Sequence, residues 1–473
     1  MNRFGTALLV TLSVVGFGRA ASAADMPTKA PPAPPPPTFN WTGFYVGGYY
    51  GTALGYQTGS TPDLTAPGTR FGQTNVNQNG LTAGATAGYN WQFNPHWLVG
   101  LEGDIGYLGV NRTNLEFNDG IFVGLKTDWY ATARARFGYV AGPSLVYATG
   151  GAAFVHTKDK FGGEAFAPGN AIPTESSKTI VSWTAGGGVE TKLSRAWSAK
   201  SEYLFIDGGN QQFASNTFGG FVTAPTPVSF DHSYHVVRTG LNYKFGESES
   251  FFAFFGAPLI PSDHDWNGFY VGVNAGVGQS IVNAPEATTV TVINKTQLNG
   301  TGFAGGGQIG YNFTGIFTPK LFVGVEADFG ALQIRAKMTD WFDQNFIFTA
   351  DTDWYATARA RFGVTTGPAL LYFTAGGAWV HLSTGFTPNV GTPNAQLFSK
   401  TAGGWTFGGG TEVALDPRWS ARLEALYIDV GHEVASINTP TPLFGADFRN
   451  RFQVVRFGLN YKLGGDKLAW TRN

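Results

Sequence analysis

Acidic and basic residues recur at matching positions in the two halves of this chain. The mid-segment members of this set are Glu102, Arg134, Glu202 and Arg238, followed by Glu326, Arg359, Glu424 and Arg456. Paired carboxylates are the groups that glycosidases use, whereas alternating charges inside a closed wall form either an ion path or a network of ion pairs. Which chemistry applies depends on the elements that carry these charges.

Two histidines, His156 and His381, also occupy matching positions. Imidazole ligates haem and metals, so a haem or metal site is one interpretation; a residue beside an aromatic girdle at a membrane interface is the one we favour. A hydrolase or acyltransferase triad of Ser, His and carboxylate cannot be assembled from the spacing. We therefore expect no catalytic residues, no metal and no cofactor, and a protein that is not an enzyme.

The segments that carry these residues occur twice. TDWYATARARFG stands at residues 127–138 and again at 352–363, and NWTGFYVGG at residue 40 returns as DWNGFYVGV at residue 265. The closing segment HVVRTGLNYKFG at residue 235 likewise returns as QVVRFGLNYKLG at residue 453. Because opening and closing segments are both duplicated at a spacing of roughly 220 residues, each copy is expected to be a whole domain.

The alternation of residue types within TDWYATARARFG predicts a β-strand with one polar and one apolar face. Arg134 and Arg136 fall on the polar face, whereas Trp129, a row of alanines and Phe137 fall on the other. Trp129 and Phe137 are about 20 Å apart in depth on a strand tilted near 40°, which suits the edges of a lipid-facing band. The charges are therefore expected to face inward.

Eight strand-like runs are predicted in the first copy, at residues 43–54, 80–92, 97–109, 126–139, 144–158, 179–192, 197–206 and 233–245. Short turns alternate with long polar loops, which are expected at residues 55–79, 110–125, 159–178 and 207–232. Short turns on one side and long loops on the other are typical of outer-membrane β-barrels. The fold class is therefore all-β: two tandem eight-stranded antiparallel transmembrane barrels or, alternatively, one merged sixteen-stranded barrel.

The inward charges of both copies are expected to pair across neighbouring strands, Glu102 with Arg134 and Glu202 with Arg238. An ion-pair network that fills a narrow interior is the favoured interpretation, and an ion path or gate is the other. The network is predicted to contain Glu102, Asp104, Arg134, Arg136, Glu202, Arg238, Glu326, Asp328, Arg359, Arg361, Glu424 and Arg456.

Aromatic residues near the ends of the predicted strands are expected to mark the two membrane interfaces. They are Trp41, Trp97, Trp129, Phe137, Trp183, Trp197, Tyr243, Trp266, Trp354, Phe362, Trp405, Trp419 and Tyr461.

Composition and the chain ends indicate export. Residues 1–23 have the charged start, apolar stretch and A-x-A site of a signal peptide, and the absence of cysteine excludes a disulfide framework and a lipid-bearing cysteine. A formal net charge of −1 gives no reason to expect nucleic acid as a partner. The expected organisation is a proline-rich periplasmic tether at 24–39, barrels at 40–246 and 265–465, a linker at 247–264 and a tail at 466–473.

The motifs ADMPTKAPPAPPPP, WTGFYVGG, TDWYATARARFG and VVRTGLNYKFG resemble those of the OmpA-like porin-family outer-membrane proteins of alpha-proteobacteria, which include major surface antigens. The resemblance implies a barrel in the outer membrane of a Gram-negative bacterium, in contact with outer-membrane lipid and inserted by the barrel-assembly machinery. It implies a role in envelope integrity and surface display, with some relatives binding haemin and others treated as porins for small hydrophilic solutes. No catalytic residues come with the family.

Overall fold

The computed structural model describes residues 39–62, 70–115, 121–163, 174–215, 225–247, 264–287, 292–316, 318, 320–339, 347–387, 395–437 and 444–464. The expected signal peptide, nearly all of the proline-rich tether, most of the linker and the tail lie outside these residues. Sixteen antiparallel strands make up almost all of the described chain. No helix in the described ranges is long and apolar enough to cross a membrane.

The first eight strands close into one barrel. Each strand pairs with the next along the chain, and β8 pairs back with β1, so that Tyr45 lies opposite Lys244. The strands are β1 (Gly43–Pro62), β2 (Arg70–Gln92), β3 (Trp97–Leu115), β4 (Ile121–Ala141), β5 (Ser144–Gly163), β6 (Thr174–Lys192), β7 (Trp197–Ser215) and β8 (Thr226–Lys244).

The last eight strands close into a second barrel in the same way. Strand β16 pairs with β9, so that Lys462 lies opposite Tyr270. The strands are β9 (Gly268–Ala287), β10 (Val292–Thr314), β11 (Leu321–Thr339), β12 (Ile347–Thr365), β13 (Ala369–Thr387), β14 (Ala395–Ala414), β15 (Trp419–Ile437) and β16 (Phe444–Lys462). We call the two units barrel 1 and barrel 2.

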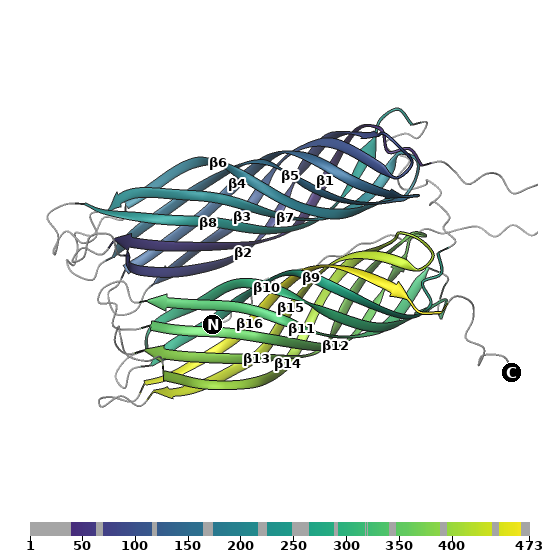
Figure 1. Cartoon of the computed structure of the whole chain (residues 1–473). Coiled ribbons are helices and arrows are strands. Elements are labelled where there is room, and N and C mark those ends of the chain that lie inside the picture. Colours follow the sequence, from purple (N-terminus) through teal and green to yellow (C-terminus); the bar gives the residue numbers. More distant parts are fainter. Residues whose placement is uncertain are drawn as a thin grey trace, which may run out of the picture.

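The prediction of two tandem eight-stranded barrels is confirmed, and the alternative of one merged barrel is wrong. Each barrel closes on itself, and among the described residues the two ladders meet only at one backbone pair, Thr339 opposite Gln73. Each barrel closes through its own terminal strands, β8 with β1 and β16 with β9, so the two barrels do not share one continuous wall. Figure 1 shows the two barrels side by side with their long axes roughly parallel.

The strands are longer than the sequence predicted. Strand β1 has 20 residues and β2 has 23, and the strands extend into all four ranges that were expected to be loops in the first copy. At ~3.3 Å per residue and a tilt near 40°, a strand of this length covers about 50 Å, well beyond the ~30 Å hydrocarbon core. Several polar residues of these outer segments are buried inside the continuing ladder, among them Gln57, Ser60 and Gln211, so polarity alone did not mark where the strands end.

Candidate functional site

The charges of TDWYATARARFG lie at the centre of barrel 1. Glu102 on β3 is directly opposite Arg134 on β4, and Glu202 on β7 is directly opposite Arg238 on β8. The Arg134 guanidinium also donates to Asp104 Oδ2 at 2.7 Å and to Glu202 Oε1 at 3.0 Å, so it joins carboxylates from opposite walls. All of these side chains point into the barrel and none is exposed.

The remaining cations of barrel 1 complete this network. Arg238 Nε donates to Glu202 Oε2 at 2.7 Å, and Arg136 Nη2 donates to Glu190 Oε2 at 2.7 Å. Lys200 Nζ lies 2.9 Å from Glu102 Oε2. Four carboxylates therefore meet four cations in one layer, whose members are Glu102, Asp104, Glu190 and Glu202 with Arg134, Arg136, Lys200 and Arg238.

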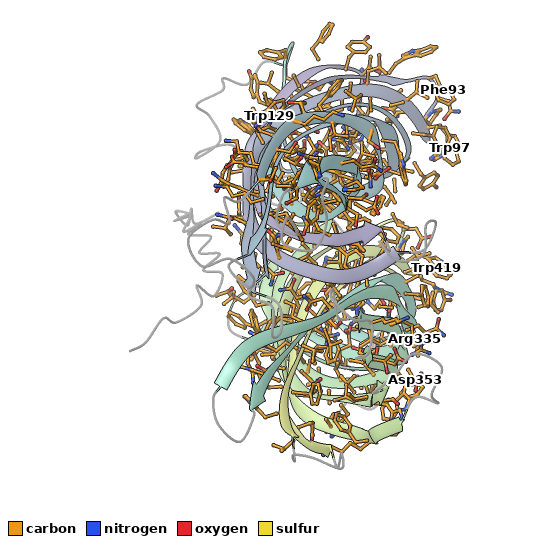
Figure 2. The ribbon with its side chains drawn as sticks, turned by 90° about the vertical axis from the view of Figure 1, so that its left-hand side faces the viewer. Phe93, Trp97, Trp129, Arg335, Asp353 and Trp419 are labelled. Carbon is orange, nitrogen blue, oxygen red and sulfur yellow. The ribbon has the colours of Figure 1, made fainter. Side chains whose placement is uncertain are left out.

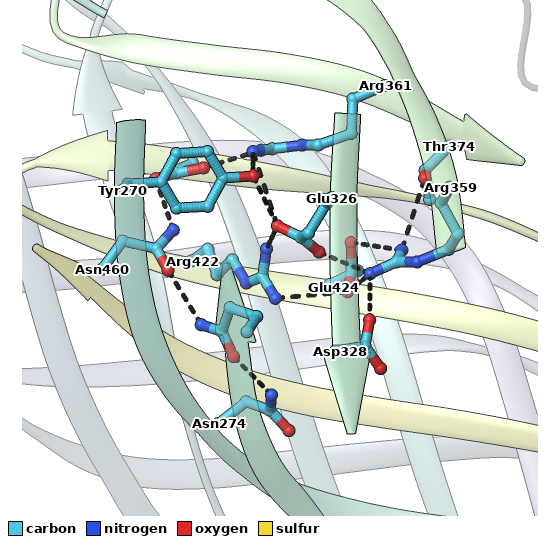
Figure 3. A network of polar contacts seen from close by, with 12 residues as sticks. Tyr270, Asn274, Glu326, Asp328, Arg359, Arg361, Thr374, Arg422, Glu424 and Asn460 are labelled. Carbon is cyan, nitrogen blue, oxygen red and sulfur yellow. Dashed lines mark hydrogen bonds and ion pairs between the residues drawn. The ribbon is translucent and has the colours of Figure 1, made fainter. Parts of the chain in front are cut away.

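Barrel 2 contains the same network with one change of residue type, and Figure 3 shows it from close by. Arg359 Nη2 donates to Asp328 Oδ2 at 2.8 Å, and its Nη1 donates to Glu424 Oε1 at 3.0 Å. Arg422 stands where barrel 1 has Lys200 and donates to Glu326. The members here are Glu326, Asp328, Glu412 and Glu424 with Arg359, Arg361, Arg422 and Arg456.

Because the charged side chains of this layer are buried, each of them needs partners of opposite charge. A lone buried charge costs several kcal/mol in effective desolvation, and the penalty is recovered only with close geometry and further hydrogen bonds. In barrel 2 the Tyr355 hydroxyl accepts from Arg456 at 2.7 Å, and the Tyr372 hydroxyl donates to Glu424 at 3.1 Å. Equal numbers of both signs and added tyrosine contacts are what a mutually neutralising network requires.

Sequence reasoning missed several members of the two networks. Glu190 and Glu412 lie on the inward faces of β6 and β14, and the tyrosines Tyr45 and Tyr270 donate to Glu102 and Glu326 at 2.6 Å. The alternation of β6 could have found Glu190, because Gly186, Gly188 and Glu190 share one face.

Glycines on β6 and β14 leave room for two tyrosines that contact the network. A Cβ on Gly188 would lie 2.8 Å from the Tyr147 hydroxyl, and one on Gly410 would lie 2.7 Å from the Tyr372 hydroxyl. These hydroxyls reach Glu202 and Glu424 respectively. The glycines therefore leave the space through which each tyrosine reaches the network.

Apolar side chains pack in the interior on both sides of the ionic layer. Towards the long-loop end, the apolar cluster of barrel 1 includes Leu108, Val155 and Leu204, and that of barrel 2 includes Leu332, Val380 and Leu426. Towards the short-turn end, a cluster around Trp41 contains Leu98, Leu145 and Tyr147, and one around Trp266 contains Phe322 and Tyr372. Each charged layer is thus enclosed between apolar layers.

Three of the expected interface tryptophans are buried. Trp41 is 4% exposed and Trp266 is 7% exposed, because the chain enters each barrel across its mouth and turns these rings inward before the first strand begins. Trp197 is also buried and packs against Tyr243. These three rings therefore do not lie open on the outer surface, and that they mark the membrane interfaces stays a prediction.

The other expected aromatics point outward. The rings that are well exposed are Trp97, Trp129, Phe137, Trp183, Phe362, Trp405 and Trp419, while Trp354, Tyr243 and Tyr461 are half-buried. Figure 2 shows Trp97, Trp129 and Trp419 on the outside of the ribbon. Trp97 stacks on Phe137 with a ring-centroid distance of 5.0 Å, so neighbouring strands build a continuous aromatic patch near the short-turn end.

A buried polar pair distinguishes the outer part of barrel 1. His232 Nε2 lies 2.9 Å from Asp159 Oδ2, and both side chains are buried. Asn450 and Thr384 occupy the equivalent positions of barrel 2, where Asn450 Nδ2 donates to the Phe448 carbonyl at 3.0 Å.

His156 and His381 lie on the outside of separate barrels. His156 stacks on Trp129 at 5.9 Å, and His381 stacks on Trp354 at 6.0 Å. Thr179 and Thr401 are their hydroxyl neighbours. Within the ranges that the structure describes, no group of three or more His, Cys, Asp or Glu side chains could hold a metal ion.

Comparison with known proteins matches both halves of the chain. The family model described as "Outer membrane protein beta-barrel domain" matches residues 12–245 and again 250–462. The 31 kDa outer-membrane immunogenic protein of Brucella melitensis is 35% identical over 246 residues, which cover 48% of this chain and 95% of the relative. The 22 kDa outer membrane protein of Rhizobium leguminosarum is 28% identical and matches 45% of this chain and 82% of its own length.

Among solved structures, the outer membrane protein OprG of Pseudomonas aeruginosa covers 43% of this chain and 100% of its own, with 13% identity and a TM-score of 0.28. The two family matches and the alpha-proteobacterial relatives confirm the resemblance seen in the sequence motifs. The chain belongs to the outer-membrane β-barrel family and is an outer-membrane protein of Gram-negative type in which the barrel domain occurs twice.

Proposed function

We propose that this protein is a non-enzymatic structural component of the outer membrane, which supports envelope integrity and presents its loops at the cell surface. The observation that carries the proposal is the interior of each barrel, where ion-paired side chains form a layer enclosed by apolar clusters. An eight-stranded barrel is just wide enough for side chains to fill it, and here the largest fully buried side chains include five arginines. These observations support closed interiors in both barrels.

The competing function is a passive channel for small hydrophilic solutes. Such a channel needs a water-filled interior, which porins obtain with 16 to 18 strands. Liposomes that contain the purified protein and are placed in solutions of sugars of increasing size test the difference. We expect no swelling above that of protein-free liposomes. Swelling that decreases with sugar size would support a channel and contradict the closed interiors.

The envelope role has its own test in cells. A strain that lacks this protein is expected to become more sensitive to detergent and to large antibiotics that an intact outer membrane excludes. Complementation with the full chain should restore the original resistance. The full chain that carries Arg359→Ala in barrel 2 should restore less of it. A deletion strain with unchanged resistance would contradict the envelope role without bearing on whether the interiors conduct.

Membership of the outer-membrane β-barrel family also bears on how this chain is inserted into the membrane. We propose that the barrel-assembly machinery inserts the chain and reads the outward row of β16, which includes Phe457, Leu459 and Tyr461 close to its end. Removal of residues 466–473 should leave the amount of inserted protein unchanged, and a large loss would place the signal in the tail.

A further inference from the structure

Polar side chains point outward from one face of each barrel and are nevertheless buried. Ser201 on β7, Thr411 on β14 and Gln279 on β9 lie on outward faces, and Gln279 is 0% exposed. Elsewhere the outward rows are apolar and open, as at Leu101, which is 69% exposed, and at Val325. A polar group in lipid without a hydrogen-bond partner is costly, so these outward polar groups need something other than lipid against them.

The other barrel covers this face. Ser201 Oγ lies 2.8 Å from Thr411 Oγ1, and Gln279 Nε2 donates to the Gly55 carbonyl at 3.2 Å, both across the gap between the barrels. Nearer the short-turn end, an apolar cluster combines residues of both barrels, among them Val189, Ala369, Val413 and Ala421. The contact therefore runs from the short-turn end outward, and Figures 1 and 2 show the barrels side by side from two directions.

The strands that meet across this contact are equivalent strands of the two copies. Strand β6 contacts β14, β7 contacts β15 and β2 contacts β10, and each of these pairs consists of the same element in its own copy. The cross contacts are also reciprocal, since β2 with β11 is matched by β3 with β10. An interface in which both copies use the same surface is called isologous, and a two-fold axis relates its two sides.

The residue positions fit such an axis. Glu202 corresponds to Glu424 and Glu190 corresponds to Glu412, so Ser201 corresponds to Leu423 and Thr411 corresponds to Val189. Leu423 and Val189 both point outward and are buried. The buried, outward polar residues Ser201 and Thr411 therefore have buried, outward apolar residues as their equivalents, and Gln279 and its equivalent Leu54 are also both buried.

We propose that the two barrels recognise each other through one self-complementary face that both copies carry, so that the chain is a pseudo-two-fold barrel pair written as a single polypeptide. The partner of each face is the sister barrel of the same chain. Small and polar side chains allow close approach and hydrogen bonding between the walls, as at contacts between helices within membranes. The pairing holds the long-loop ends of the two barrels side by side in a fixed relation.

Cysteine pairs in the full-length chain test this proposal, because the natural sequence contains no cysteine. The first variant carries Ser201→Cys and Thr411→Cys, and the second carries the symmetry-related changes Val189→Cys and Leu423→Cys. The matched control carries Leu101→Cys and Val325→Cys, which are equivalent positions on outward faces that remain open. Outer membranes are treated with a mild oxidant, and peptides from the monomeric and the dimeric bands are analysed separately by mass spectrometry without reduction.

We expect both interface pairs to yield joined peptides within one chain, and the control pair to yield separate peptides. Joining of 201 with 411 but not of 189 with 423 would overturn the two-fold relation. Separate peptides for both pairs in chains that retain the strand signal in circular dichroism would show that the barrels stand apart. Joining only between chains would assign the face to another molecule and also overturn the proposal. If a variant does not fold, Leu54→Cys with Gln279→Cys replaces it under the same criteria.

Discussion

The interiors of barrel 1 and barrel 2 agree in their charged layers and differ in the layers above them. Seven of the eight charged positions carry the same residue type in both, and only Lys200 differs, as Arg422. Nearer the loops, buried Gln57 and Tyr234 of barrel 1 correspond to Val282 and Phe452 of barrel 2. The Asp159 and His232 pair is likewise absent from barrel 2.

This difference shows which buried polar residues can be replaced by other residue types, and whether they must be replaced singly or in pairs. In the charged layer most groups contact more than one group of opposite charge, so the loss of one leaves an uncompensated buried charge. In the outer layer Asp159 and His232 contact each other, and barrel 2 has Thr384 and Asn450 in their places, so both partners of the contact are replaced together. Replacing both partners can be nearly neutral where removing one is not.

The largest effect is expected from the central arginine of either network. Arg134→Ala leaves Glu102, Asp104 and Glu202 without their shared cation, and we expect a loss of about 3–5 kcal/mol in the free energy of unfolding. Arg359→Ala should produce the same loss in barrel 2. Tryptophan fluorescence during urea unfolding in detergent micelles measures both values.

The control for these variants is an exposed pair at the outer end of barrel 2. Arg335 lies 3.3 Å from Asp353, and both side chains are about half exposed. Figure 2 shows the two residues together. Arg335→Ala should change the free energy of unfolding by less than about 1 kcal/mol. A larger loss here than for Arg134→Ala would contradict the importance of the buried layer.

The outer polar pair of barrel 1 tests whether its partners change as a unit. Asp159→Ala leaves buried His232 without its carboxylate, and we expect a loss of about 1–3 kcal/mol. The double variant Asp159→Thr with His232→Asn installs the residues of barrel 2 and should recover most of that loss. If the double variant is as unstable as the single one in the same unfolding measurement, the two barrels differ for another reason.

A smaller effect is expected where the charged layers themselves differ. Arg422→Lys keeps a cation near Glu326 but reduces the number of possible hydrogen bonds, so we expect a loss of about 0.5–1.5 kcal/mol. Calorimetry of the variant beside the parent chain detects this change. A loss equal to that of Arg359→Ala would mean that the guanidinium geometry, and not the charge, is what barrel 2 requires.

The smallest effect is expected from the outward histidines. His156 and His381 stack on tryptophans of separate barrels, so His156→Ala with His381→Ala should change stability by no more than about 0.5 kcal/mol. Absorption spectra taken with added haemin should be the same for this double variant and the parent. A spectrum that loses its protein-bound band only in the variant would establish histidine-dependent haemin binding.

The sequence predicted the barrels because the period-2 alternation and the duplicated opening and closing segments are local signals. Pairing of Glu102 with Arg134 could also be expected, since both lie on inward faces of consecutive strands. The contact of Arg134 with Glu202 could not, because it spans the interior between β4 and β7 and depends on the diameter of the closed barrel.

Two other features lay beyond sequence reasoning for different physical reasons. Trp41 precedes the first strand, where alternation no longer tells inside from outside, and the ring turns into the barrel mouth. Outward Ser201 was not distinguished from a lipid-facing residue because its partner, Thr411, lies 210 residues away in the other copy. Polar residues on otherwise apolar strand faces were the signal in the sequence that could have indicated contact between the barrels.

Planar-bilayer recording of the purified full-length chain tests the central claim most directly. Filled interiors in both barrels predict no stable conductance steps at any applied voltage, in bilayers where a known porin inserted afterwards does produce them. Stable steps of porin size that appear with the parent chain would contradict the account, because ions would then have to cross a layer in which the eight charged side chains of each network are paired and buried.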